Sequence, residues 1–418
     1  MPGAAGRRAT RKRQLGRQTP DRRCPPVDQT KQRREKYVKK RLLLIVLAMA
    51  LLAASILSGC QSDGRETVVV YNWGEYIANE NDTYTWFGRD YEIADVIDAF
   101  EEAYPQYKVK YLTYDDNEKM YPKIGKDVYD VIVPSEYMVV RLIKEDLIQP
   151  IDRSGMENVN RYLDPRLSDL PFDPDPAVSA SVYDYAVPYM YCTVGLLYNR
   201  DELGMIESSD PAVVWDVLFD ESLQGRVGMY SSMRESIGMA LNYQGNSLNT
   251  LDEAQLEAAK QLLINQRQTV RPLVGIDELK DKYISGELAA GIAWSGDHVV
   301  CQLRLEEDGA DPQSLQYILP KGSNMSIDLM CIPSNAANVE GAKAFIDFMY
   351  QPDIALMNAV YVGYSTPNTA ALEQLPEEII NNQSYYPDAD TIDTLEFYYS
   401  SDAIDNTYDE IWQVIMAN

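Results

Sequence analysis

The residues best suited to chemistry lie in the segment 71–76, Tyr-Asn-Trp-Gly-Glu-Tyr, which follows the apolar run Val68–Val70. Aromatic rings and a carboxylate therefore stand at the end of a strand that we expect to be buried, where open α/β sheets bind ligands. Ring faces attract ammonium groups, and a carboxylate takes up their charge and hydrogen bonds. The segment thus favours binding of an alkyl cation, although a strand ending in core aromatics explains this segment alone equally well.

Later segments combine the same residue types. Asp328 interrupts the apolar run 325–333, where a lone carboxylate is unusual because charged groups avoid apolar surroundings. Trp294 ends an apolar strand, and Asp297 follows it by three residues. Trp294 as an ordinary core residue and Asp297 as a helix N-cap are the alternative interpretations. Together the segments favour a cage of rings and carboxylates around a cation.

An N-terminal leader precedes the expected fold. Residues 39–41 are basic, and residues 42–57 form an apolar run without a charge, which is short for a membrane span but typical of a secretory signal. Leu-Ser-Gly then stands directly before Cys60, a pattern like the site where bacterial lipoproteins are cleaved and lipidated. We therefore predict that residues 1–59 are leader and signal peptide, that Cys60 is lipidated, and that residues 60–66 form a tether. An uncleaved signal anchor is the alternative, and the true translation start stays open.

The mature chain is strongly acidic. The whole sequence carries 38 Lys and Arg against 64 Asp and Glu, and residues 1–59 hold 15 of the former and 3 of the latter. Removal of the leader therefore lowers the formal net charge from −26 to −38. Such a chain repels nucleic acid and anionic lipid and attracts cations. Solubility alone also explains an acidic surface, so the charge permits a cationic ligand without identifying one.

Cysteine and histidine usage argues against several kinds of site. Besides Cys60, the expected mature chain keeps Cys192, Cys301 and Cys331, all in apolar contexts typical of buried thiols and none at a metal-site spacing. His298 is the one histidine of the sequence, which argues against His-based catalysis and His-ligated metals. Walker A, Gly-x-Ser-x-Gly and His-Glu-x-x-His motifs are also absent. We therefore predict no cofactor, no metal ion and no enzymatic activity.

The elements that must position these residues follow a strand–helix alternation. This alternation predicts an α/β fold with a mostly parallel sheet and helices on both faces. The length from Cys60 onward is natural for two domains. The polar and aromatic segment 79–91 is expected to be a loop, and the Pro- and Asp-rich stretch 170–176 a boundary before the first crossover. Strands are expected at 68–71, 108–114, 129–133, 193–198, 226–230, 289–294 and 326–332, and helices at 93–103, 212–219, 251–267 and 339–350.

The ordered set of motifs resembles one family, the spermidine/putrescine (polyamine)-binding proteins of ABC importers, which are type II periplasmic binding proteins. The resemblance covers essentially the whole mature chain from Val68 to the C-terminus. No single motif is decisive, but the set in its order is specific. The matching segments are 71–76, 129–137, 172–174, 185–189, 233–235, 293–297 and 363–368, together with Asp328.

The resemblance implies two α/β lobes joined by hinge crossovers, with the ligand in the cleft between them. Lobe 1 is expected over 67–186 plus 329–375, and lobe 2 over 187–328 plus 376–418. The implied function is capture of a polyamine, spermidine and/or putrescine, and its delivery to an ABC permease and its ATPase. A monomer is expected, either at the extracytoplasmic face of the bacterial cell membrane, attached by its lipid anchor alone, or in the periplasm.

The family's pocket is implied at nine positions of this sequence. Aromatic and hydroxyl walls are expected from the two lobes, and three carboxylates are expected to receive ammonium groups. Each buried amine needs such an acceptor, because a desolvated ammonium without a partner is strongly unfavourable. The implied walls are Trp73, Tyr76, Ser135, Tyr137, Trp294 and Tyr364, and the implied carboxylates are Glu235, Asp297 and Asp328.

Some of these residues also have plainer interpretations, and two positions depart from the family. Glu235 with Arg234 is also typical of a surface helix pair, and Ser135 of a helix cap. Ser232 stands where spermidine-binding members usually carry a second acid, and Ser326 where many carry an aromatic residue. Tyr398 or Tyr399 could supply the aromatic ring that is missing at Ser326, but no motif fixes the alignment of these two residues with the family.

Three alternatives to the polyamine receptor therefore stay open at this point. The first is a receptor of the same fold for a different cationic solute, which Ser232 and Ser326 permit. The second is a surface lipoprotein that senses a ligand for a partner protein. The least favoured is an enzyme in which Asp297 and Asp328 act as acid and base.

Overall fold

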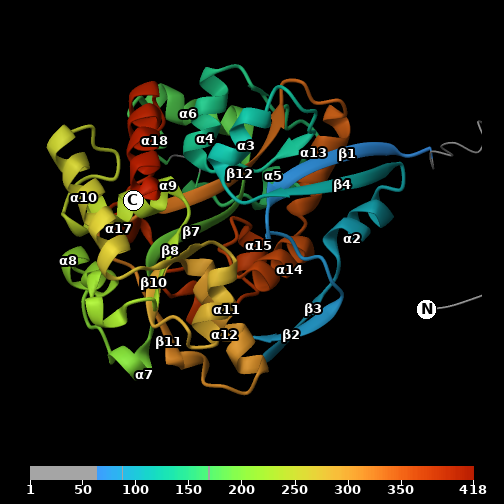
Figure 1. Ribbon diagram of the computed structural model, residues 1–418. Helices are drawn as coiled ribbons and strands as arrows, with labels where there is room; N and C mark the ends of the chain where they lie inside the picture. The colour runs from blue at the N-terminus through green and yellow to red at the C-terminus, as the bar shows by residue number, and fades with distance from the viewer. Residues whose placement is uncertain (1–63, 87, 168–169) are drawn as a thin grey trace, which may run out of the picture. The chain divides into compact units, whose positions relative to one another are not determined.

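The computed structural model of the chain describes residues 64–418 apart from residues 87 and 168–169 (Figure 1). The segment Arg65–Asn418 forms one compact unit. The predicted signal peptide and the lipidation at Cys60 lie outside the described residues.

Ten of the strands form one sheet, in the order β4-β1-β5-β12-β7-β10-β8-β9, with β11 added to β7 and β6 to β12. The sheet is parallel towards its two ends, where β1 pairs with β4 and β5, and β8 pairs with β10 and β9. The strands are β1 Glu66–Trp73, β2 Asp82–Trp86, β3 Arg89–Ile93, β4 Tyr107–Tyr114, β5 Val131–Ile132, β6 Ile148–Gln149, β7 Ala186–Asn199, β8 Val227–Tyr230, β9 Leu273–Gly275, β10 Ala290–Trp294, β11 Leu315–Ile318 and β12 Met325–Pro333.

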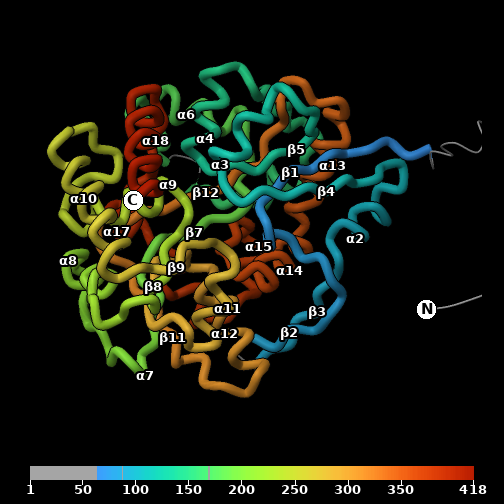
Figure 2. The backbone as a smooth tube through the Cα atoms, in the orientation of Figure 1, coloured from blue at the N-terminus to red at the C-terminus, as the bar shows by residue number. Residues whose placement is uncertain are grey.

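The centre of the sheet is antiparallel, so the prediction of a mostly parallel sheet is wrong there. β12 pairs antiparallel with both β5 and β7, and β7 pairs antiparallel with β10 and β11. The reason is that β7 and β12 are long crossover strands, buried throughout except at Asn199, rather than members of strand–helix–strand units. Figure 2 shows the two strands side by side at the centre of the sheet.

Two hydrophobic cores lie along this sheet, and β7 contributes to both. Its first part, up to Tyr191, belongs to the core that contains β1, β4, β5 and β12. Its second part, from Val194, belongs to the core that contains β8, β10 and α9. Residues between Ile379 and Tyr398 also pack into the first core. The boundaries of the two lobes stay a prediction.

Most expected strands and helices are present within a few residues, but one segment differs. Residues 79–91, expected to be a loop, contain β2 and part of β3, which pair as an antiparallel hairpin. The alternation of Thr83, Tyr84, Thr85 and Trp86 favours a strand, and Trp86 is buried. The many charged residues around this alternation concealed it.

Helices cover the sheet and complete the two cores. α13 packs against β1 and β12, α12 against β10 and β7, and α18 lies beside α9 and α10 (Figure 1). The expected helix 212–219 is a short α-helix followed by a 3₁₀ turn over Trp215–Phe219. The α-helices are α2 Val96–Ala103, α3 Asn117–Met120, α4 Glu136–Lys144, α5 Glu157–Tyr162, α6 Pro176–Tyr185, α7 Arg200–Leu203, α8 Pro211–Val214, α9 Met233–Tyr243, α10 Glu253–Thr269, α11 Glu278–Ile284, α12 Ser295–Glu307, α13 Val339–Met349, α14 Pro352–Val362, α15 Thr369–Leu372, α16 Glu377–Ile380, α17 Ala389–Ile392 and α18 Asp402–Ala417.

Candidate functional site

A cavity of about 500 Å³ lies where residues of both cores meet. Its walls come from the end of β1, the start of α4, β12, the first turn of α9, α11 and the junction of β10 with α12. Seven of the nine predicted site residues line it: Trp73, Tyr76, Ser135, Glu235, Trp294, Asp328 and Tyr364.

Asp328 is a buried carboxylate that the sheet presents to this cavity. The pairing of β12 with β7 shifts register between Asp328 and Leu329, next to Pro188 on β7. A proline contributes no N–H to the ladder, and such irregularities redirect a side chain. Tyr76 Oη donates to Asp328 Oδ2 at 2.7 Å, and Ser135 Oγ donates to Oδ1 at 2.8 Å. Burial raises the pKa of Asp328 to about 6, although these hydrogen bonds lower it.

The second cavity carboxylate, Glu235, lies in the first turn of α9. Burial raises its pKa to about 7, and the hydrogen bond from the Ser232 hydroxyl opposes that rise. Ser232 therefore supports Glu235 at the position where a second acid was expected. Arg234 and Glu235 are both buried, so a surface helix pair is the wrong interpretation.

The aromatic walls are fixed by ring contacts. Tyr76 meets Tyr364 edge-on with the ring centroids 5.1 Å apart, and Trp294 stacks on Tyr230 at 4.2 Å. Gly296 permits this packing, because a Cβ at that position would lie 2.0 Å from Cδ2 of Tyr364. Gly296, two residues after Trp294, thus allows the Tyr364 ring to lie against the start of α12.

Asp297 does not line the cavity but lies directly behind its wall. It is buried and accepts hydrogen bonds from Tyr230 Oη at 2.5 Å and from Tyr364 Oη at 3.2 Å. α12 begins at Ser295 with Trp294 as its N-cap, so the interpretation of Asp297 as the cap is wrong. Asp297 holds the two rings in place from behind.

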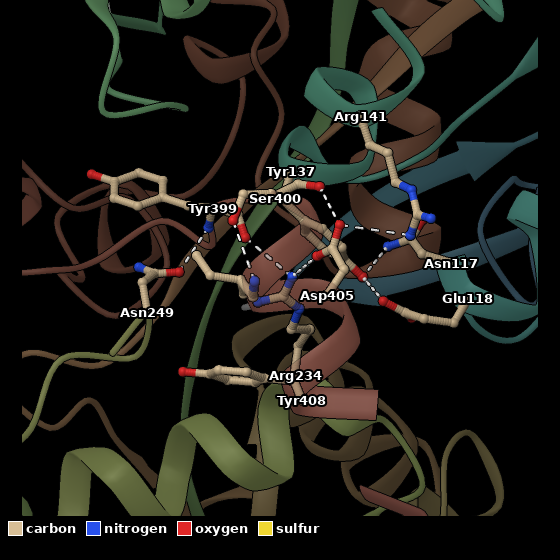
Figure 3. Close-up of polar contacts among 12 residues, drawn as sticks. Asn117, Glu118, Tyr137, Arg141, Arg234, Asn249, Tyr399, Ser400, Asp405 and Tyr408 are labelled. Atoms are coloured by element: carbon tan, nitrogen blue, oxygen red, sulfur yellow. Dashed lines mark hydrogen bonds and ion pairs between the residues drawn. The ribbon is translucent and has the colours of Figure 1, made fainter. Parts of the chain in front are cut away.

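Tyr137 also lies outside the cavity lining, and belongs to the network of polar contacts that Figure 3 shows. Its hydroxyl donates to Glu118 Oε1 at 2.9 Å and accepts from Asn117 Nδ2 at 3.1 Å. Its ring lies 5.0 Å from the guanidinium carbon of Arg234, which forms an ion pair with Asp405 at 2.5 Å. Tyr137 therefore belongs to the buried network that positions the start of α9, where Glu235 stands.

Ser326, the second position that departs from the family, has a carboxylate as its hydrogen-bond partner, as Ser232 does. Ser326 lines the cavity, and its hydroxyl donates to Glu136 Oε2 at 2.9 Å. Burial raises the pKa of Glu136 to about 8. The Tyr398 ring is buried near Gly238, and neither Tyr398 nor Tyr399 lines the cavity, so neither replaces the missing ring.

Comparison with known proteins decides the family. A family model for bacterial extracellular solute-binding proteins matches residues 95–385. This chain belongs to that family. The spermidine/putrescine-binding periplasmic protein of Escherichia coli (strain K12) is 33% identical over 381 residues, which cover 89% of this chain and 97% of the relative. The putrescine-binding periplasmic protein PotF of the same organism is 28% identical over 363 residues, which cover 84% of this chain and 91% of PotF.

Solved structures support the same assignment. The spermidine/putrescine ABC transporter substrate-binding protein PotD of Streptococcus pneumoniae is 33% identical, with a TM-score of 0.63 over 84% of this chain and 99% of that chain. A structure from Listeria monocytogenes is 35% identical, with a TM-score of 0.70 over the same shares. The predicted periplasmic-binding-protein fold is confirmed, and membership of this family confirms a non-enzymatic solute-binding protein.

The solute-binding protein has charged cavity residues that the sequence did not indicate. Lys280 and Asp277 line the cavity from α11 and its N-terminal flank. Glu75, the carboxylate of segment 71–76, also lines it, just after the end of β1; that segment indicated it, whereas the family's nine positions did not include it. Lys280 and Lys282 look alike in the sequence, and only the former is buried. No local pattern separates them.

Within residues 64–418, apart from the gaps at 87 and 168–169, no group of three or more His, Cys, Asp or Glu side chains of the solute-binding protein is arranged to hold a metal ion. None of the helices there is both long and apolar enough to cross a bilayer.

Proposed function

We propose that this solute-binding protein captures a polyamine, spermidine and/or putrescine, and delivers it to an ABC permease and its ATPase. The observation that carries the proposal is Asp328. In the described part of the chain no lysine or arginine lies within ion-pair distance of it, yet the carboxylate is buried in a cavity with aromatic walls. A buried carboxylate in that state is stabilised by an incoming ammonium group.

The chemistry of the remaining lining supports the same ligand class. A polyamine alternates ammonium groups with short alkyl chains, and it needs carboxylates at intervals with apolar faces between them. Asp328 and Glu235 supply the carboxylates, and Trp73, Trp294 and Tyr364 supply ring faces that attract cations and cover methylene groups. The relatives at 33% and 28% identity are named for spermidine and putrescine binding.

Delivery is proposed to follow closure of two lobes, 67–186 plus 329–375 and 187–328 plus 376–418, around the ligand. Polyamine binding favours the closed form, and the permease distinguishes that form from the open one. The protein acts as a monomer, and no step changes the ligand chemically.

Calorimetric titration tests the ligand. The purified protein is unfolded and refolded to remove carried-over ligand, and is then titrated with putrescine, cadaverine, spermidine and spermine. One-to-one binding at about micromolar Kd or tighter is expected for at least one of them. If none binds, the ligand is a different cationic solute, which is the second candidate and is favoured by Ser326 in place of a ring.

We also propose that the protein is anchored at the extracytoplasmic face of the membrane by lipid on Cys60, after removal of residues 1–59. The Leu-Ser-Gly-Cys pattern at the end of the apolar run supports this. A Cys60→Ser variant is expected to lose fatty-acid labelling and to leave the membrane fraction. Unchanged labelling and fractionation would remove the anchor proposal and leave ligand binding untouched.

A further inference from the structure

Lys280 brings a positive charge into the cavity. Its side chain is 6% exposed, and its Nζ lies 2.8 Å from Asp277 Oδ1 and 3.2 Å from Glu75 Oε2. Asp297 Oδ1 lies 3.6 Å from the same nitrogen. Burial alone would lower the pKa of Lys280, but these three carboxylates outweigh burial and raise it. Lys280 is therefore a charged ammonium with three carboxylate neighbours.

The end of β1 is adapted to this arrangement. Glu75 has a φ of 45°, a left-handed conformation that non-glycine residues seldom adopt. At the preceding Gly74, a Cβ would lie 3.1 Å from Oδ2 of Asp277, so a larger residue would press against the cluster. The pair Gly74 and Glu75, which follows β1, thus places the Glu75 carboxylate beside the Lys280 ammonium group on α11.

The cluster is continuous with the aromatic cage. Asp297, which Lys280 approaches, also accepts the hydroxyl hydrogens of Tyr230 and Tyr364. Tyr364 lines the cavity, and Tyr230 stacks on the lining residue Trp294. The Lys280 ammonium consequently lies among rings and carboxylates, in surroundings of the kind that a ligand ammonium requires.

Asp328 and Glu235, the two buried carboxylates that line the cavity, differ from this cluster. Asp328 accepts hydrogen bonds from hydroxyl groups, as does Glu235, and in the described residues neither has a lysine or arginine at ion-pair distance. The cavity therefore has one carboxylate cluster that already contains an ammonium group, and two buried carboxylates that have no cationic side chain at ion-pair distance.

We infer that Lys280 is a specificity-determining residue that occupies one ammonium position of the cavity, so that the protein prefers a diamine to a triamine. The inference rests on the proposed function and names the ligand class more narrowly. A diamine places one ammonium at each open carboxylate. The third ammonium of a triamine meets the charge of Lys280 instead of a free acid.

Further acids at the cavity do not change this expectation. Glu80, Asp115 and Glu307 line it but are exposed to solvent, and Asp115 already forms an ion pair with Lys119 at 2.7 Å. Water and salt screen such exposed charges, and they also screen Glu75, whose side chain is 54% exposed, so these acids discriminate little between ligands.

The test compares putrescine, a diamine, with spermidine, a triamine, by calorimetry on the purified, ligand-stripped protein at fixed ionic strength. Wild type is expected to bind putrescine at least about tenfold more tightly than spermidine. In Lys280→Met the ratio is expected to move towards spermidine by about tenfold or more, because the ammonium group of Lys280 no longer occupies the position beside Asp277 and Glu75. Lys280→Arg, which keeps the charge, is expected to retain the wild-type ratio.

Lys282→Met is the matched control. Lys282 lies on the same helix with its side chain 38% exposed, in an ion pair with Glu287. Its loss is expected to leave the ratio unchanged. Lys280→Met leaves Asp277 and Asp297 without an ion-pair partner, and leaves Glu75 with Arg304 at 3.8 Å. The double variant Lys280→Met with Glu75→Gln, which lowers the acidic charge of the cluster by one, therefore repeats the measurement if the single variant does not fold.

The outcomes separate the two proposals. If wild type binds neither amine, the proposed function fails and this inference fails with it. If wild type binds but prefers spermidine, or if the ratio stays within about twofold when Lys280 is replaced, only the inference is overturned.

Discussion

Replacement of Asp328 by asparagine is expected to have opposite effects on binding and on stability. The side chain is buried, and its two hydrogen-bond donors are the hydroxyls of Tyr76 and Ser135, which can rotate to suit an amide. Asn keeps the shape and removes the charge. Polyamine binding is expected to weaken by roughly 2–5 kcal/mol, because a desolvated ammonium loses its acceptor. By calorimetry this is a loss of about 30-fold to several thousandfold in affinity.

The stability of the ligand-free protein is expected to move the other way. Burial raises the pKa of Asp328 from about 3.8 to about 6, so the folded state disfavours the ionised carboxylate. Its ionisation therefore destabilises the fold progressively as pH rises from about 4 to above 6, by on the order of 3 kcal/mol. Asp328→Asn is expected to recover part of that free energy of unfolding at pH 7 and none of it at pH 4, as measured by urea unfolding.

Asp130 offers a matched control for this substitution. It is also a buried aspartate with two hydrogen bonds, but its donors are the backbone N–H groups of Val69 and Asn338, at 2.8 and 2.7 Å. Asp130→Asn places an amide NH₂ against a fixed N–H, and is expected to lower stability by about 1–3 kcal/mol while leaving affinity near wild type. If Asp328→Asn behaves like Asp130→Asn, the Asp328 carboxylate is structural and the reasoning is refuted.

Three other predictions concern the same cavity. Trp294→Ala is expected to weaken polyamine binding by about 1–3 kcal/mol through loss of a cation–π face and packing, measured by calorimetry; wild-type affinity would show that the ring is only core. Affinity is expected to fall as pH decreases from 8 to 5, because Asp328 and Glu235, with pKa values of about 6 and about 7, take up protons and lose their charge; a flat titration series would contradict this. Gly296→Ala is expected to weaken binding at least about tenfold, because the added Cβ collides with Tyr364; unchanged affinity would mean that this ring does not form the wall.

Local sequence patterns predicted the strands that carry a continuous apolar run. The apolar runs of β1 and β12 stand out from their flanks, and both strands form as expected. The hairpin of β2 and β3 was missed because its one buried side carries Trp86 and Tyr91 among many charged residues. The antiparallel centre was missed because pairing depends on which distant strand arrives beside β7, and no local pattern encodes that.

In the candidate site, too, local motifs indicated some residues, whereas contacts between distant segments could not be predicted. Motif positions indicated the cavity lining, including Trp73, Asp328 and Tyr364. The cluster of Lys280 with Glu75 and Asp297 was not predicted, because it joins residues from three separate segments. Burial of an individual lysine on a mixed helix depends on what packs against it, which the helix sequence alone does not contain.

The position of β12 in the sheet has a consequence for how the chain folds. β12 lies between β5 and β7, yet it follows both in the sequence with most of the second core between. The first core therefore cannot be completed until β12 has been synthesised, and until then β5 and β7 present open edges. Such long-range pairing makes folding slow, since distant segments must meet before their contacts stabilise anything. For a chain that crosses a membrane unfolded, this late closure postpones completion of the first core until residues 325–333 have passed through.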